Sequence, residues 1–145
     1  MKKSLNLDEL FITTDKSKLN LNLIHKFLRT AYWSKGRSAE IINKSIKNSL
    51  CFGVYNKNEQ LGFARVVTDY SIFAYMADVF ILEDYRDMGI GKRLIQTILG
   101  YPELKDVKRW MLATTDAHKF YSQFGFKGLE HPEKVMELKK SNSQS

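Results

Sequence analysis

Cysteine and proline are scarce in this chain of 145 residues. Its single cysteine, Cys51, excludes an intramolecular disulfide and any metal cluster built from thiolates. Cys51 lies in the apolar run 50–54, where a thiol is more often a small core residue than a nucleophile. No internal repeat and no Pro- or Gly/Ser-rich linker divides the sequence. We therefore expect one domain over residues 1–140, followed by a polar tail at 141–145.

Long apolar runs are also missing. No stretch approaches the roughly 20 apolar residues that a membrane-spanning helix needs. Met1-Lys2-Lys3 is followed by Asp8 and Glu9 and not by the apolar segment of a signal peptide. We therefore expect a cytoplasmic protein that has no membrane partner.

The charge is unbalanced toward the basic side, with 23 Lys and Arg against 16 Asp and Glu and a formal net charge of +7. A basic protein favours anionic partners such as nucleic acid, an acidic membrane or a polyphosphorylated cofactor, although the charge can also serve solubility alone. The basic residues are spread along the chain, and the aromatic residues fall in apolar runs instead of among them. With no recognised nucleic-acid motif either, we expect no nucleic-acid partner.

The composition, 43% hydrophobic and 12% aromatic, is too apolar for a disordered chain. Apolar periodicity predicts helices at 21–33, after residue 38, at 90–99 and at 117–124, and strands at 9–14, 50–55, 60–68, 73–82, 107–113 and 135–138. Ser38 and Asp116 are expected to cap the helices that follow them. The strand at 73–82 is nearly all apolar, which indicates that both of its faces are covered, and Asp78 is its single charge. The order predicts a mixed sheet with helices on its faces and one strand–helix–strand crossover.

The most informative stretch is 79–94, where the buried strand leads through a loop into a helix. The first N–H groups of a helix have no internal partner and the helix dipole is positive there, so a phosphate suits this position. Gly89 and Gly91 lack a Cβ, which lets an anion approach the backbone closely. Positive charge is added by Arg86, Lys92 and Arg93.

Two better-known phosphate-binding patterns do not fit this loop. A P-loop would need glycine at position 86 and Ser or Thr at position 93, and both are Arg. A dinucleotide fingerprint that starts at Gly89 would need a small residue at position 94, which is Leu. The remaining pattern is Arg86-x-x-Gly89-x-Gly91 after a strand. A helix start with suitable glycines and no ligand stays open as the alternative.

Together with a second stretch downstream, this pattern resembles the GNAT superfamily of N-acetyltransferases. The acetyl-CoA motif of that superfamily is Arg/Gln-x-x-Gly-x-Gly/Ala, which residues 86–91 match. Its second signature is a strand followed by a helix with Ala-x-x-x-Tyr and then Gly-Phe, matched by Ala117, Tyr121 and Gly125-Phe126. The resemblance covers about residues 50–127, and the first fifty only loosely. Many relatives carry Asn where this chain has Asp116. We interpret Asp116 as the cap of the helix that follows it.

The resemblance implies a single-domain α/β fold in which a mixed, mostly antiparallel, splayed sheet is flanked by about four helices. The strand that holds Asp78 and the strand that ends near Ala113 would part. The pantetheine arm of acetyl-CoA would lie in that gap, with the thioester near the N–H of Phe80. Backbone partners for this arm would be Val79 and Ile81. The cofactor-binding residues that the resemblance implies are Val79, Phe80, Ile81, Arg86, Asp87, Met88, Gly89, Ile90, Gly91, Lys92, Arg93 and Tyr121, and no metal is expected.

Acyl transfer to an amine needs a neutral amine and a stabilised leaving thiolate. Tyr121 occupies the superfamily's acid position, and a phenol of pKa near 10 is close enough to a thiol near 8.5 to donate a proton to it. Asp78 is the candidate base, because burial makes a carboxylate a stronger base. A structural partnership of Asp78 with Arg65 is the open alternative. His118 or ordered water could also take the proton.

The acceptor site is expected between the first two helices and the central strands. Candidate residues there are Tyr32, Trp33, Arg37, Tyr70, Phe73 and Tyr75. Aromatic rings could enclose the apolar part of an amine and Arg37 could pair with a carboxylate, although an ordinary core explains most of the rings equally well.

The sequence therefore predicts an acetyl-CoA-dependent N-acetyltransferase. Its acceptor would be a primary amine of a small molecule or a lysine of a protein or peptide, and it would act by direct attack in a ternary complex. A non-catalytic acyl-CoA-binding module of the same fold is the alternative. Either a monomer or a homodimer fits the sequence.

Overall fold

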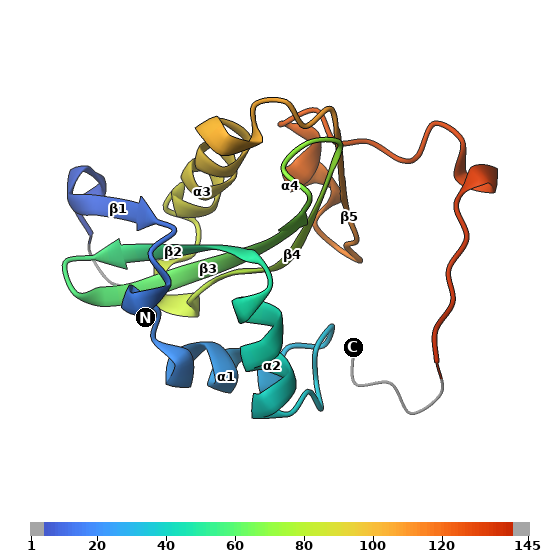
Figure 1. The fold of residues 1–145 in the computed structure, drawn as a ribbon. Helices are drawn as coiled ribbons and strands as arrows, with labels where there is room; N and C mark the ends of the chain where they lie inside the picture. Colours follow the sequence, from blue (N-terminus) through green and yellow to red (C-terminus); the bar gives the residue numbers. More distant parts are fainter. Residues whose placement is uncertain (1–4, 141–145) are drawn as a thin grey trace.

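A five-stranded sheet forms the centre of the molecule (Figure 1). The computed structural model describes residues 5–140. The strand order is β1 (Leu10–Thr13), β2 (Leu50–Asn56), β3 (Glu59–Thr68), β4 (Phe73–Ile81) and β5 (Arg109–Leu112). Neighbouring strands are antiparallel from β1 to β4, while β4 and β5 are parallel. The predicted mixed, mostly antiparallel α/β sheet is therefore confirmed.

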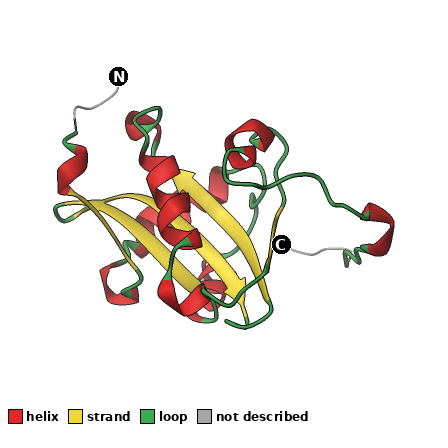
Figure 2. Ribbon diagram, turned by 90° about the horizontal axis from the view of Figure 1, so that it is seen from above, coloured by secondary structure: helices red, strands yellow, loops and turns green. Residues whose placement is uncertain are grey.

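Within residues 5–140, four α-helices cover the two faces of this sheet, as Figures 1 and 2 show. On one face α1 (Leu21–Thr30) and α2 (Ala39–Lys47) pack their buried isoleucines and Leu28 against Phe63 and Phe80. On the other face α3 (Ile90–Leu99) packs a buried apolar stripe on β2 and β3, and α4 (His118–Ser122) adds Tyr121. Apolar spacing at every third or fourth residue produces each stripe, because those positions share one side of a helix.

Of the two predicted helix caps, the one for α2 is confirmed and the one for α4 is wrong. Ser38 Oγ accepts from the N–H of Ile41 and begins α2 as predicted. Asp116 was expected to cap α4, but the N-cap residue is Ala117, and no side chain bonds the first turn of α4. Thr114 Oγ1 accepts the N–H of Ala117 instead, at 3.0 Å. Asp116 is one residue too early to act as the cap, and its side chain is exposed.

The predicted strand at 135–138 is wrong. Residues 127–140, which we call the C-terminal arm, contain a short 3₁₀ turn at Pro132–Lys134 and otherwise run as extended chain. Figure 1 shows this arm, in orange to red, leaving the body of the molecule. A strand needs a neighbour that completes its hydrogen bonds, and within the described residues the arm meets none. The expected tail at 141–145 and the lysines at 2 and 3 lie outside the described residues.

Candidate active site

The strands β4 and β5 pair along only part of their length. Paired positions run from Phe73 with Arg109 to Met76 with Leu112. From there to Ile81, β4 is paired with β3 and no longer with β5. Over residues 77–81 the edge of β4 that faces β5 is therefore not paired with a strand of the described chain. This is the parting of strands that a splayed sheet requires.

The backbone groups that point into this gap follow from the hydrogen bonding to β3. Leu82 donates its N–H to the carbonyl of Leu61 in β3, at 2.8 Å. Successive residues of a strand direct their backbone groups to opposite edges, so Phe80 also faces β3, whereas Val79 and Ile81 face the gap. The N–H of Phe80 is consequently part of the ladder. The backbone donor expected near Phe80 is better placed at Val79 or Ile81.

A β-bulge in β4 sets this arrangement. Asp78 has φ of +53°, in the left-handed region, where Asp is more common than most residues. The register shifts there: Phe63 pairs with Phe80 but Arg65 with Ala77. The bulge also reverses the alternation of side chains, so that even-numbered residues before and after it lie on opposite faces of the sheet. Buried Ala74 and Met76 before it pack in the core with α3, whereas Phe80 after it packs in the core with α1 and α2.

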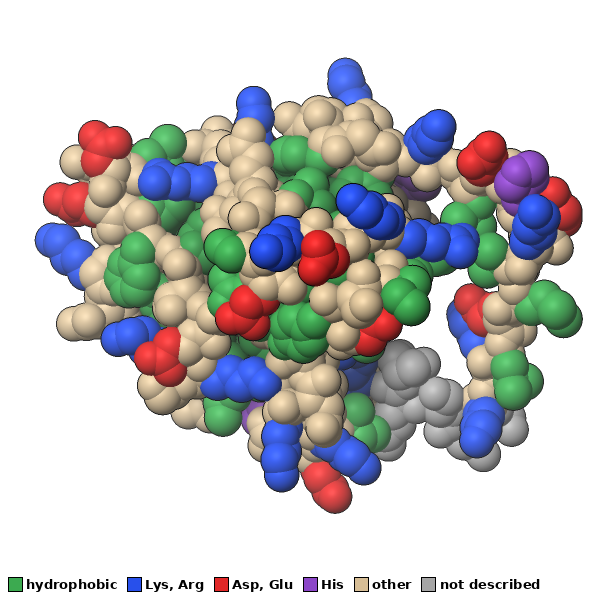
Figure 3. Space-filling view, turned by 45° about the horizontal axis from the view of Figure 1, so that its top comes forward, with side chains coloured by type: hydrophobic (Ala, Val, Ile, Leu, Met, Phe, Trp, Pro, Cys, Tyr) green, Lys and Arg blue, Asp and Glu red, His purple; other side chains and the backbone are tan. Residues whose placement is uncertain are grey.

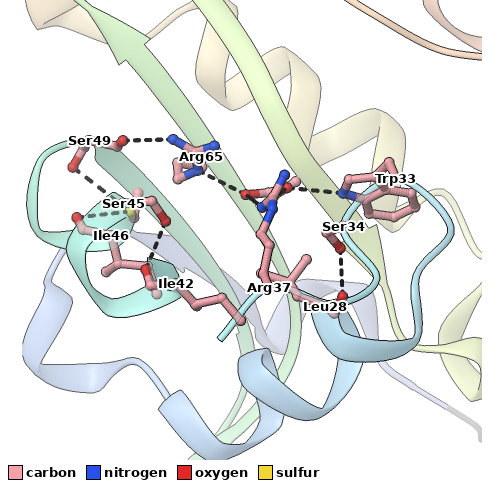
Figure 4. Close-up of polar contacts among 11 residues, drawn as sticks. Leu28, Trp33, Ser34, Arg37, Ile42, Ser45, Ile46, Ser49 and Arg65 are labelled. Carbon is pink, nitrogen blue, oxygen red and sulfur yellow. Dashed lines mark hydrogen bonds and ion pairs between the residues drawn. The ribbon is translucent and has the colours of Figure 1, made fainter. Parts of the chain in front are cut away.

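Three side chains hold the carboxylate of Asp78. Figure 4 labels these three, Trp33, Arg37 and Arg65, and shows them converging. Arg65 Nε lies 2.8 Å from Oδ2, Arg37 Nη1 lies 3.0 Å from both oxygens, and Trp33 Nε1 lies 2.9 Å from Oδ1. Only 1% of the Asp78 side chain is exposed, against 12% for Arg37 and 14% for Arg65. Arg65 also donates to Ser49 Oγ, at 3.1 Å. We call Trp33, Arg37, Arg65 and Asp78 the Asp78 cluster.

The Asp78 cluster favours the structural interpretation of this carboxylate over the catalytic one. Both oxygens already accept charge-assisted hydrogen bonds, and a proton on either oxygen would weaken them. The same contacts bear on Arg37, which was expected to pair with a substrate carboxylate. Its charge is already matched by Asp78. Trp33, expected to line the acceptor site, uses its only hydrogen-bond donor on Asp78.

The predicted phosphate loop has the backbone geometry of an anion site. Gly89 is the N-cap of α3 with φ of +84°, a conformation that glycine adopts without strain. No side chain caps the helix, and within the described residues the N–H groups of Ile90, Gly91 and Lys92 bond no acceptor. These groups lie at the positive end of the helix dipole. The structure thus leaves room for an acceptor supplied by a ligand.

Other residues of the loop have roles that the sequence did not show. A Cβ at Gly91 would lie 3.4 Å from the Phe120 ring, an ordinary contact distance, so the packing of α3 beside α4 does not itself require glycine here. Arg86 Nε donates to the carbonyl of Ile81, at 3.0 Å, on the edge that faces the gap. Arg93 Nη1 donates to the carbonyl of Leu7, at 2.7 Å, so its charge is directed to the N-terminal segment.

Tyr121, the candidate acid, lies in α4 and is 9% exposed. Its ring packs edge-on against Phe120 and Phe126. Burial, and to a smaller extent the nearby Tyr32, raises the pKa of Tyr121 to about 12. Tyr32 in turn accepts a hydrogen bond from Thr115 Oγ1, which joins the α1–α2 loop to the segment after β5. This bridge could not be predicted from the sequence, because the two residues are 83 positions apart.

The remaining candidates are more scattered. Phe73 and Tyr75 are half-buried in the part of β4 that pairs with β5. Tyr70 lies in the β3–β4 loop with 43% of its surface exposed, and the side chain of His118 is exposed. Within residues 5–140, no group of three or more metal-binding side chains comes together. No helix of this part of the chain has the length and apolar character to cross a membrane.

Comparisons with known proteins match most of this chain to one family. The model of the acetyltransferase (GNAT) family matches residues 20–126. A crystal structure of a Xanthomonas campestris protein that belongs to the GNAT family is 37% identical, with a TM-score of 0.88 over 90% of this chain and 93% of that one.

Two further relatives are more distant. The Gibberella zeae protein FG08082, whose name describes it as an acetyltransferase, is 29% identical. The match covers 80% of this chain and 78% of that protein. A GNAT family acetyltransferase of Elizabethkingia anophelis, whose structure has acetyl-CoA bound, is 19% identical with a TM-score of 0.62 over 83% of this chain and 77% of that one. At that identity the likeness shows the fold alone.

We predict that Asp78→Asn destabilises the protein by roughly 3 kcal/mol, because removing one partner leaves buried charges uncompensated. Urea unfolding measures the loss. Asp106→Asn, at an exposed position, is the matched control and should stay within about 0.5 kcal/mol of the native chain. Equal unfolding midpoints for the two variants would show that the Asp78 cluster does not stabilise the fold.

Proposed function

The chain belongs to the acetyltransferase (GNAT) family, and from that premise we propose that it transfers an acetyl group from acetyl-CoA to a primary amine. The acceptor is an amine of a small molecule or a lysine of a protein or peptide, and it attacks directly in a ternary complex. One observation supports this proposal above the others: β4 has an open edge over residues 77–81, and it leads through a short loop into a helix start without a side-chain cap.

The start of α3 would hold the phosphates of acetyl-CoA. The N–H groups of Ile90, Gly91 and Lys92 supply donors that the helix itself cannot use. Lys92 is exposed beside them and can add its charge, whereas Arg93 is occupied at Leu7. An acceptor-only group such as a pyrophosphate complements this donor set, so the residues present fit the cofactor.

The open edge of β4 would hold the pantetheine arm. Val79 and Ile81 direct their backbone groups into the gap, and an extended amide chain can pair with them as an added strand would. The carbonyl of Ile81 is now bonded to Arg86 Nε. Binding would exchange this contact and release the guanidinium toward the phosphates. Acetyl-CoA supplies the activated acyl group, and a strand N–H such as that of Val79 can hydrogen-bond the thioester oxygen.

Tyr121 would donate to the leaving sulfur. A pKa of about 12 keeps the phenol protonated at neutral pH, so the donor is always present. The same shift makes Tyr121 a weaker acid than an exposed tyrosine and widens the mismatch with a thiol near 8.5. The main contribution of Tyr121 is therefore a hydrogen bond that stabilises the thiolate, with proton transfer following.

No side chain of the Asp78 cluster would serve as the base. Asp78 is bonded to two guanidinium groups, and His118 is exposed on the short helix α4. We propose that the amine gives its proton to water. Activity should then rise with pH as the free amine becomes more abundant.

We predict that Gly89→Glu abolishes binding of acetyl-CoA, because the carboxylate would stand at the positive helix start where the phosphates belong. Calorimetric titration measures the affinity. Gly89→Asn is the matched control, since asparagine tolerates the left-handed conformation and adds no charge. Undiminished binding by the Glu variant would place the phosphates elsewhere.

We predict that Tyr121→Phe lowers kcat about 100-fold and leaves the affinity for acetyl-CoA nearly unchanged, as expected for a proton donor. Thiol release with a panel of amines measures kcat. Tyr101→Phe is the control, because that hydroxyl bonds Thr14, which follows β1 at the other end of the sheet from β5. A Tyr121→Phe variant as fast as this control would rule out the acid role. Binding without thiol release by the native chain would favour the non-catalytic module.

A further inference from the structure

Two neighbouring side chains connect the strands of the splayed pair across the gap. On the β4 side, Trp33 Nε1 donates to the carboxylate of Asp78, at 2.9 Å. On the β5 side, the hydroxyl of Tyr32 accepts from Thr115 Oγ1, just beyond the end of β5. The rings of Tyr32 and Trp33 meet edge-on, with centroids 5.2 Å apart. The loop between α1 and α2 therefore crosses the gap at these two residues.

This crossing lies on the face of the sheet opposite to the proposed phosphate site. The start of α3 would hold the phosphates, and α3 packs on the other face from α1 and α2. Acetyl-CoA would thus occupy the α3 side of the gap, which leaves the α1–α2 side for the amine. A hollow of about 690 Å³ beside the C-terminal arm, at the right of Figure 3, is a different place, because its lining includes no residue of β4. Tyr32 consequently stands where the amine would enter.

The loop that carries Tyr32 is anchored, whereas the ring of Tyr32 is largely exposed. Ser34 is fully buried, and its Oγ donates to the carbonyl of Leu28 at 2.6 Å (Figure 4). Trp33 is held by Asp78. Tyr32 itself is 61% exposed. Exposed side chains change rotamer within nanoseconds, so the bond to Thr115 can open and close by rotation of one ring while the loop stays in place.

We propose that the hydrogen bond between Tyr32 and Thr115 is a gate on the acceptor side of the gap. When it is closed it keeps water and amines from the thioester, and when it is open it admits the amine. The gate rests on the proposed function, because it controls the path of the amine in the same site. Burial and then the nearby Tyr32 raise the pKa of Tyr121, which places the gate beside the candidate acid. Excluding water protects a reactive intermediate from hydrolysis.

The strength of one hydrogen bond sets the size of the expected effect. A bond of this kind shifts an equilibrium by about fivefold, and less where water competes for it. The apparent affinity for a ligand is reduced by the fraction of molecules that cannot admit it. Loss of the bond should therefore lower KM for the amine by about two- to fivefold. Hydrolysis of acetyl-CoA in the absence of an amine should rise by a similar factor.

Steady-state kinetics on two complementary variants tests the gate. Tyr32→Phe and Thr115→Val remove the same hydrogen bond from its two ends and nearly keep the size of each side chain. Each should raise kcat/KM for the amine about two- to fivefold. The double variant should show no further gain, because one bond can be lost only once. Tyr101→Phe and Thr97→Val are the matched controls: their hydroxyls are bonded elsewhere in the fold, and their kcat/KM should equal that of the native chain.

Alkylation of bound coenzyme A tests the gate without any transfer reaction. The thiol of the bound cofactor would lie behind the gate. Cys51 is the single cysteine of the chain and is buried, so iodoacetamide reports on the cofactor thiol. With protein in excess, this thiol should react about two- to fivefold faster in Tyr32→Phe and in Thr115→Val than in the native chain. Equal rates in all three proteins would overturn the gate.

The two measurements separate the gate from the proposed function. If the native chain binds coenzyme A but acetylates no amine, the proposed function fails, while faster alkylation in both variants would still support the gate. If amines are acetylated and neither variant is faster than the native chain, the function stands and the gate is overturned. Gains that add in the double variant would also overturn it, because the two residues would then act separately. A chain that binds no coenzyme A would overturn both.

Discussion

The buried charge of Asp78 is the constraint on which the site depends. A left-handed residue in the middle of a strand needs support, and here it comes from cations on two elements: Arg65 in β3 and Arg37 just before α2. The bulge turns Val79 and Ile81 toward the gap and Phe80 into the α1–α2 layer. One carboxylate thereby joins the strand that would bind acetyl-CoA to the loop between α1 and α2.

The side chains that stabilise the fold at this site are different from the groups that would act on ligands. Because the Asp78 cluster is satisfied internally, the groups left to act on ligands are mainly backbone N–H groups and one buried phenol. Backbone donors are fixed by the fold and need no reorientation when a ligand arrives, which makes them suited to binding phosphates and amides. Part of the basic composition serves the fold and not a ligand, since Arg37, Arg65 and Arg93 are bonded within the protein.

Local patterns predicted the parts of the structure that local forces determine. Helices α1, α2 and α3, the β2–β3 hairpin and the loop from Arg86 to Gly91 follow from apolar periodicity, caps and glycines within a few residues of each other. What could not be predicted depends on distant partners. The partnership of Asp78 with Arg37 depends on the register of the sheet, and the bridge from Tyr32 to Thr115 depends on the packing of both layers. Residues 135–138 do not form a strand because they pair with no strand of the described sheet, which local periodicity cannot show.

The short β4–β5 pairing has a consequence for the order in which the molecule forms. Strands β2, β3 and β4 follow one another through tight connections and can assemble from contacts that are close in sequence. β5 joins them on the far side of the α3 crossover, through four pairs of residues that are 36 positions apart, such as Phe73 and Arg109. Contacts of such long separation close late and slowly. The gap for acetyl-CoA would thus form after the β2–β4 meander, and a chain stalled before β5 docks would hold that meander and yet lack the gap.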